Sequence, residues 1–150
     1  MSTKKFMTRS AEETRSAAAR FAAELMRRKP AKTALVLALQ GDLGAGKTTF
    51  AQGFAEGLGI KEVVNSPTFV VIKRFKIYAS NFKNFYHIDC YRLGEAEELS
   101  SLGLRAIIDN PENIVAIEWP ERIALLLPKH RFKLKFEAVS EYERHIAITI

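Results

Sequence analysis

The sequence predicts an α/β protein in which helices flank a mostly parallel central sheet that carries an added antiparallel hairpin. Three observations lead to this prediction. The continuous apolar run Ala34–Leu39 has the length of a strand buried on both faces, as in a parallel sheet. A glycine-rich loop and a helical pattern follow it at once. Later segments alternate apolar with basic residues, which is typical of strands with one wet face.

The chain has 150 residues, which fits one compact domain spanning residues 1–150. No apolar run approaches the roughly 18–20 residues that span a bilayer, and Met1–Phe6 lacks the apolar stretch of a signal peptide. The single cysteine, Cys90, cannot form an internal disulfide, which suits a reducing compartment. We therefore expect a cytoplasmic protein that does not bind a membrane.

The net charge is +6, so the surface is basic. A basic surface attracts nucleotides, RNA or an acidic partner protein. Because the basic residues are spread along the chain rather than gathered in blocks, a solvated surface without a special role explains the charge equally well.

The first half of the chain predicts two helices around the buried strand. Residues Ser10–Lys29 follow helical spacing, with Ser10 and Glu13 as a capping box and Pro30 as the stop. A second helix is expected from about Lys47 to Leu58, ended by Gly59.

The middle of the chain predicts a hairpin. Thr68–Ile72 has the composition of one strand, and a second runs from Phe82 to about Asp89. Ala79–Asn81 is the expected turn between them. A short helix is expected at Glu95–Leu102.

The remaining segments predict a short buried strand, a helix and two late strands. The buried strand is Ile114–Ile117, which ends in Glu118. The helix begins with proline in its first turn, at Pro120–Leu127. The late strands are Arg131–Phe136 and Arg144–Ile150.

The glycine-rich loop Gly41–Thr48 matches G-x-x-x-x-G-K-[ST], the Walker A motif of P-loop NTPases. Its glycines let several backbone N–H groups point at an anion, and the following helix adds its positive end. Lys47 can reach the β- and γ-phosphates, and the Thr48 hydroxyl can coordinate Mg²⁺. No guanine-reading N-K-x-D sequence is present, which favours ATP over GTP. The residues expected to bind the nucleotide here are Asp42, Gly44, Ala45, Gly46, Lys47, Thr48 and Thr49.

Two acids stand at the ends of predicted strands, where ligands of open α/β sheets bind. Glu118 follows four apolar residues, as in a Walker B sequence, and could hold Mg²⁺ through water or activate the attacking water. Asp89 is a second candidate for metal or water contact, and both acids could instead be ordinary strand-end carboxylates. We count Lys47, Asp89 and Glu118 as the catalytic candidates, with Thr48 and Glu118 as metal ligands. The sequence does not decide which acid orients water.

Three further features have a structural and a functional interpretation. Thr68 follows Ser66-Pro67 and could sense the γ-phosphate, as switch threonines do, or belong to an ordinary turn. For His87, a hydrogen-bonded structural histidine is favoured over a catalytic one, because histidines within predicted strands more often have a structural function. Residues Phe69–Arg92 mix aromatic with basic side chains, which can bind single-stranded RNA. The favoured interpretation is a hairpin with aromatic side chains on its core face and basic side chains on its solvent-exposed face.

Four segments together resemble the bacterial TsaE family. The resemblance runs from about Ser10 to Glu121, and the last thirty residues match only in their two-strand character. One departure is Cys90, where the family more often has leucine, and we expect it to be a packing change. The four segments are Gly41–Thr49, Ser66–Phe69, Tyr86–Leu93 and Ile117–Glu121.

The resemblance implies a function in making the threonylcarbamoyl adenosine modification at position 37 of tRNA. It implies a P-loop α/β fold with a modified strand order and a weak Mg²⁺-dependent ATPase. It also implies a partner, the TsaB–TsaD pair, in which TsaD transfers the threonylcarbamoyl group and which the nucleotide cycle resets or licenses. The tRNA is then reached indirectly, and a direct contact of the basic face with tRNA stays open.

The resemblance also assigns roles residue by residue. Lys47 and Thr48 become the phosphate and Mg²⁺ ligands, and Thr68 the switch-like threonine. Asp89 is the acid of the H-x-D-x-Y-R-L segment, and Glu118 is the Walker B-like acid. The remaining assignments are Trp119 as a packing or partner-contact residue beside the site, and Glu12 and Thr14 near the adenine.

Three functions remain open at this stage. The first is an ATPase that acts on a protein complex by in-line attack of water on the γ-phosphate. No arginine finger can be assigned, which fits slow intrinsic turnover and stimulation by a partner. The second is a nucleotide-gated binding module in which hydrolysis is incidental. The third is a small-molecule kinase, for which neither an arginine-rich lid nor an acceptor pocket can be located.

Overall fold

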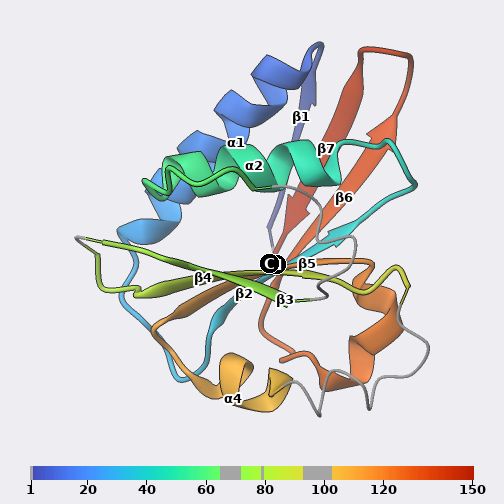
Figure 1. Cartoon of the computed structure of the whole chain (residues 1–150). Coiled ribbons are helices and arrows are strands. Elements are labelled where there is room, and N and C mark those ends of the chain that lie inside the picture. The colour runs from blue at the N-terminus through green and yellow to red at the C-terminus, as the bar shows by residue number, and fades with distance from the viewer. Residues whose placement is uncertain (1, 65–71, 79, 93–102) are drawn as a thin grey trace.

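The computed structural model describes residues 2–64, 72–78, 80–92 and 103–150. Its centre is a seven-stranded sheet in the order β1-β7-β6-β2-β5-β4-β3 (Figure 1). The strands are β1 (Thr3–Thr8), β2 (Leu35–Gln40), β3 (Ile72–Lys76), β4 (Asn84–Asp89), β5 (Asn113–Glu118), β6 (Phe132–Ala138) and β7 (Arg144–Thr149).

The four central strands β6, β2, β5 and β4 are parallel to one another. In the register, Leu39 of β2 lies opposite Glu118 of β5, and Glu118 lies opposite Asp89 of β4. The carboxyl ends of these strands therefore meet at one edge of the sheet. The predicted α/β class with a mostly parallel central sheet is confirmed.

Antiparallel pairing occurs at both margins of the sheet. β3 pairs with β4 on one side, and β7 pairs with both β6 and β1 on the other. The predicted strand Thr68–Ile72 lies outside the described residues except for Ile72, from which β3 runs on to Lys76. Ala79 of the predicted turn is also outside them.

The edge strand β1 is absent from the prediction. Its residues, Thr-Lys-Lys-Phe-Met-Thr, are mostly exposed, and they do not alternate between apolar and polar as residues of a half-buried strand do. Pairing with β7, from Thr3 opposite Thr149 to Thr8 opposite Arg144, supplies its hydrogen bonds. A partner distant in the chain, and not local preference, therefore makes this segment a strand.

Helices cover both faces of the sheet. α1 (Ala11–Met26) and α2 (Lys47–Gly57) lie on one face, and α4 (Leu104–Asp109) and the 3₁₀ helix η1 (Pro120–Leu126) lie on the other (Figure 1). No described helix combines the length and apolar character that a membrane crossing requires.

The predicted helix ends are only partly right. The N–H of Glu13 donates to the Ser10 hydroxyl at 3.0 Å, as predicted, and α1 ends at Met26, three residues before the predicted Lys29. The helix expected at Pro120–Leu127 is present as a kinked 3₁₀ helix, Pro120–Leu126, with proline in its first turn as predicted. The helix expected at 95–102 lies outside the described residues, and the short α4 after it was not predicted.

α1 and α2 pack closely because α2 carries glycine where they cross. A Cβ atom added at Gly53 would lie 2.3 Å from the carbonyl oxygen of Arg15, and one at Gly57 would lie 2.4 Å from that of Ala19. Only glycine allows this backbone-to-backbone approach. It brings the start of α1 beside the start of α2, where the site lies.

Candidate functional site

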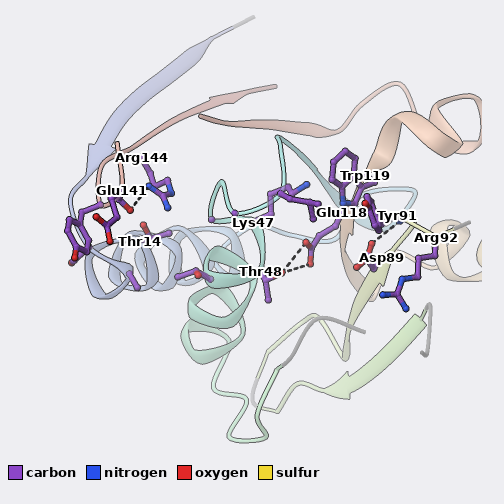
Figure 2. A pocket seen from close by; sticks show the side chains of 17 residues that line it. Thr14, Lys47, Thr48, Asp89, Tyr91, Arg92, Glu118, Trp119, Glu141 and Arg144 are labelled. Atoms are coloured by element: carbon purple, nitrogen blue, oxygen red, sulfur yellow. Dashed lines mark hydrogen bonds between the residues drawn. The ribbon is translucent and has the colours of Figure 1, made fainter. Parts of the chain in front are cut away.

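The carboxyl ends of the parallel strands open into a cleft with a volume of about 470 Å³ (Figure 2). The phosphate-loop residues line its middle. Two groups of side chains lie on either side of Lys47 in the view: Asp89, Glu118 and Trp119 on one side, and Thr14, Glu141 and Arg144 on the other. We call Lys47, Thr48 and the first group, with the side chains buried beneath them, the phosphate end, and we call the second group, with its neighbour Tyr142, the base end.

The loop between β2 and α2 forms an anion cradle. α2 begins at Lys47, and its N-cap, Gly46, has φ 104°, a conformation that residues with a side chain rarely adopt. No side chain in the described part of the chain caps this helix end. Its first N–H groups are therefore available to a phosphate, which the positive end of the helix also favours.

Lys47 is nearly buried, with 4% of its surface exposed. Its ammonium donates to the carbonyl oxygen of Gly41 and lies 3.6 Å from the centre of the Trp119 ring. Burial lowers the pKa of Lys47, and the carboxylates of Glu118 and others nearby oppose that shift. A bound phosphate would add negative charge and favour the protonated form further.

Trp119 directly follows β5 and has φ 58° and ψ 50°, the left-handed region that is costly for a residue with a side chain. Its ring faces Lys47 and lies 5.0 Å from the ring of Tyr91, centre to centre. Strained residues of this kind concentrate at functional sites. Here the strained backbone turns the indole over the ammonium of Lys47.

The carboxylate of Glu118 is fixed from two sides. The Thr48 hydroxyl donates to it, at 3.1 Å from Oε1 and 3.2 Å from Oε2 (Figure 2). On the other side, Nε2 of the buried His87 lies 2.6 Å from Oε2. The predicted metal ligands Thr48 and Glu118 are therefore adjacent, although they are far apart in the sequence.

These two groups fit a magnesium ion by their chemistry. Mg²⁺ prefers hydroxyl, carboxylate and phosphate oxygens and takes few ligands from P-loop proteins. Among the described residues, no cluster of three or more acidic, histidine or cysteine side chains could hold a metal by itself. The pair Thr48 and Glu118 therefore suits an ion that is shared with a nucleotide.

Asp89 and Cys90 follow one another at the end of β4. Asp89 lines the cleft, and its Oδ1 accepts a hydrogen bond of 2.9 Å from the N–H of Tyr91. Cys90 points to the opposite face of the sheet, into the apolar core next to α4. Burial raises its pKa to about 12, so the thiol is unreactive and serves packing.

The base end contains residues from both ends of the chain. Thr14 of α1 shares a 2.6 Å hydrogen bond with Thr8 of β1, which lies opposite Arg144 of β7. Arg144 lies against the phosphate loop, because a Cβ atom at Gly46 would be 3.8 Å from its Cγ. Its Nη1 donates to three backbone carbonyls, those of Ser140, Glu141 and Glu143.

Not all predicted site residues line the cleft. The predicted residues that line it are Thr14, Gly44, Gly46, Lys47, Thr48, Thr49, Asp89 and Glu118. Glu12 lines the neighbouring groove between β1 and α1, and Thr68 lies outside the described residues. Asp42 is an exposed residue of the loop, and Ala45 is a buried residue of the same loop.

Several cleft residues were missed by the sequence prediction. Tyr142 and Arg144 lie in a region without a motif, and Tyr91 and Arg92, although they belong to the H-x-D-x-Y-R-L segment, were given no site function. The sequence offered no signal for Arg144, because its place beside the phosphate loop depends on the β6–β7 hairpin lying next to β2 in the sheet.

Comparison with known proteins identifies relatives over most of the chain. A sequence model of the family described as "Threonylcarbamoyl adenosine biosynthesis protein TsaE" matches residues 8–146. The tRNA threonylcarbamoyladenosine biosynthesis protein TsaE of Bacillus subtilis is 43% identical over 119 residues, which cover 79% of this chain and 72% of that protein. The protein of the same name from Haemophilus influenzae is 38% identical over 107 residues, or 71% of this chain and 65% of that protein.

A solved structure agrees with the sequence relatives. The crystal structure of YdiB from Bacillus subtilis superimposes with a TM-score of 0.75 at 35% identity, covering 98% of this chain and 84% of that one. The match over residues 8–146 includes the phosphate loop and both strand-end acids. The chain therefore belongs to the TsaE family of threonylcarbamoyl adenosine biosynthesis proteins.

Proposed function

We propose that this protein is a Mg²⁺-dependent ATPase of tRNA threonylcarbamoyladenosine biosynthesis, whose nucleotide cycle resets a TsaB–TsaD complex. The observation that carries the proposal is the open cleft at the carboxyl ends of the parallel strands, with the loop Gly41–Thr48 in its middle. Family membership supports the biological process, because relatives carry the name of that pathway.

The phosphate end would bind the triphosphate and its metal ion. The uncapped N–H groups of α2 and the ammonium of Lys47 suit the β- and γ-phosphates. Lys47 would exchange its contacts with Gly41 and the Trp119 ring for phosphate oxygens. Mg²⁺, when bound, would neutralise charge on the phosphates beside Thr48 and Glu118.

The two acids would have different functions. Glu118 already accepts from the Thr48 hydroxyl, so its carboxylate is favoured as the metal-side ligand. Asp89 lies beside it across the β4–β5 register and lines the open cleft, which favours a function in orienting the attacking water. This division is our choice between the alternatives that the sequence left open, and it is testable with one variant of each acid.

The base end would bind the nucleoside. The exposed ring of Tyr142, the guanidinium of Arg144 and the first turn of α1 surround that part of the cleft. An aromatic ring and a planar guanidinium both stack on a base. The polar backbone and hydroxyl groups of the first turn of α1 lie within the same wall.

The first test is phosphate release from Mg²⁺–ATP, alone and with a purified TsaB–TsaD pair. We expect slow release alone, stimulation by the pair, and loss of both in Lys47→Ala. Lys61→Ala, which removes an exposed lysine just beyond α2, is the control for loss of one positive charge and should behave as the parent protein.

Other outcomes would point to the other functions. ATP binding without stimulated release, together with retained support of the pair, would favour a nucleotide-gated binding module. Phosphate found on a small-molecule acceptor in place of free phosphate would favour a kinase. Asp89→Asn should slow release without changing the Mg²⁺ requirement, whereas Glu118→Gln should raise that requirement, and the reverse pattern would exchange the two assignments.

A further inference from the structure

We propose that His87 is a positioning residue: its Nε2–H holds the Glu118 carboxylate in the orientation in which it faces Thr48 and a bound magnesium ion. The proposal rests on the proposed function for the identity of that ion. The orientation of Glu118 itself is a property of the chain's own contacts and can be measured separately.

The strand register brings the imidazole to the carboxylate. On the face of the sheet that α2 covers, β4 presents Phe85, His87 and Asp89, and β5 presents Ile114, Ala116 and Glu118. His87 lies opposite Ala116, and the small methyl group leaves room beside the strand. The imidazole can therefore reach diagonally to Glu118, which lies one pair further along.

The contact between the two side chains is short and dry. Nε2 of His87 and Oε2 of Glu118 are 2.6 Å apart, and the two side chains are 1% and 5% exposed. A carboxylate oxygen accepts, so Nε2 carries the donated proton. In the same carboxylate, both oxygens accept from the Thr48 hydroxyl. Glu118 is thus held from β4 on one side and from the first turn of α2 on the other.

The second ring nitrogen indicates what the histidine is for. Nδ1 of His87 is buried and has no hydrogen-bond partner among the described residues. An apolar residue would fill this space without burying polar ring atoms, so the hydrogen bond to Glu118 is the contact that the imidazole adds. The polar contact that this ring makes in the described structure is directed at Glu118.

His87 acts behind the carboxylate and not on the substrate. The described wall of the cleft contains Glu118, Asp89 and Thr48, whereas His87 is fully buried beneath it. A group that orients a metal ligand from behind typically changes metal affinity or activity by about 10–100-fold when it is lost.

The test compares two amide substitutions. The amide nitrogen of glutamine lies near the place of the histidine Nε2, whereas that of the shorter asparagine lies near Nδ1 and cannot reach Glu118. We therefore expect His87→Gln to keep most of the function and His87→Asn to lose it. A matched control is His145→Asn, because His145 makes a similar contact with Glu143 at 3.1 Å on the exposed surface.

The readout is the tightening of ATP binding by Mg²⁺, measured by calorimetry with and without the ion. We expect His87→Asn to need about 10–100-fold more Mg²⁺, with its metal-free ATP affinity unchanged. His87→Gln should lie within about threefold of the parent protein, and His145→Asn should equal it. An unchanged Mg²⁺ requirement in a folded His87→Asn protein would overturn the proposal, and so would equal losses in both His87 variants.

A measurement on the unaltered protein covers the case in which a variant does not fold. The chain has three histidines, so the ring signals can be assigned by nitrogen-15 NMR. We expect a slowly exchanging proton on Nε2 of His87 that shifts in Glu118→Gln. A proton on Nδ1 instead of Nε2 would overturn the proposal. If the unaltered protein shows this signal but no Mg²⁺-dependent ATP binding, the proposed function fails while the contact stands.

Discussion

At the phosphate end of the cleft, Lys47, His87 and Glu118 are each at most 4% exposed, whereas Tyr142 at the base end is 69% exposed. Side chains at the phosphate end hold one another, through Thr48, Glu118 and His87. At the base end, Arg144 is held by backbone carbonyls of its own hairpin. The phosphate end is thus buried and fixed by contacts between side chains, whereas the base end is open to solvent at Tyr142. Substitutions at the two ends should therefore have different consequences.

The largest effect on phosphate release is expected at Glu118, because its carboxylate contacts both Thr48 and His87. Glu118→Gln keeps the size of the side chain but removes the anion that faces Thr48. Because the metal ion would lose an anionic ligand, we expect phosphate release at saturating ATP and a limiting Mg²⁺ concentration to fall by about 10–100-fold. Tyr142→Ala, at the other end, should stay within about twofold at saturation. Equal losses in both variants would remove the distinction between the two ends.

The phosphate end could be predicted from the sequence because its residues adjoin regular elements. The motif Gly41–Thr48 lies between a buried strand and a helix, and Asp89 and Glu118 are the last residues of β4 and β5, as expected. Side chains at the carboxyl ends of adjacent parallel strands lie close together in any parallel sheet, so their proximity could be predicted without the full structure. The contact of His87 with Glu118 did not follow, because a diagonal neighbour depends on which strands are adjacent and in what register.

The base end could not be predicted for a related reason. It forms when β1, which has little strand character of its own, pairs with β7 and sets Thr8 opposite Arg144. That pairing joins the two ends of the chain, and no local pattern indicates it. The close approach of α1 and α2 at Gly53 could not be predicted either. From sequence alone, a glycine inside a helix indicates only a lower helix propensity and not a contact with another helix.

The residue where the two ends meet gives the next largest effect. Gly46 caps α2 at the phosphate end and lies under Arg144, with φ 104°. Gly46→Ala should lower the free energy of unfolding by about 1–2 kcal/mol and weaken ATP binding about tenfold. The control is Gly103→Ala, because Gly103 caps α4 with φ 86° and a Cβ atom added there would have no described residue within 4 Å.

Thermal unfolding and ATP titration of these two variants separate strain from binding. Both should lose similar stability, because each forces a side chain into a left-handed conformation. Loss of ATP affinity in Gly46→Ala alone ties the cradle to the nucleotide. Loss in both would mean that general destabilisation weakens binding and that the cradle has no special part in it.

A smaller effect is expected at the base end. Arg144→Ala removes a guanidinium that could stack on a base, together with its bonds to the hairpin carbonyls. We expect the ATP affinity to fall about fivefold, the value of roughly one hydrogen bond or stacking contact, with phosphate release unchanged at saturation. Arg105→Ala on α4, which loses an exposed ion pair with Asp109, should have no effect on either quantity.

The smallest effect near neutral pH concerns Lys47. Burial lowers its pKa from the ordinary 10.5, so the free protein begins to lose this proton at a lower pH than an exposed lysine. A bound phosphate stabilises the charged form, so binding takes up a proton wherever the free lysine is partly neutral. Linkage then requires ATP affinity to fall as pH rises towards 10.5, by less than about tenfold per pH unit.

Calorimetry above about pH 7.5, where the phosphates are already ionised, isolates the proton that Lys47 takes up when ATP binds. Lys47→Arg provides the control, because a guanidinium stays charged throughout the range and should remove the dependence. Arg144→Ala should keep the same slope at a lower affinity, since it acts at the other end of the cleft. A slope that survives in Lys47→Arg would assign the proton to another group and would weaken the argument that burial at the phosphate end controls binding.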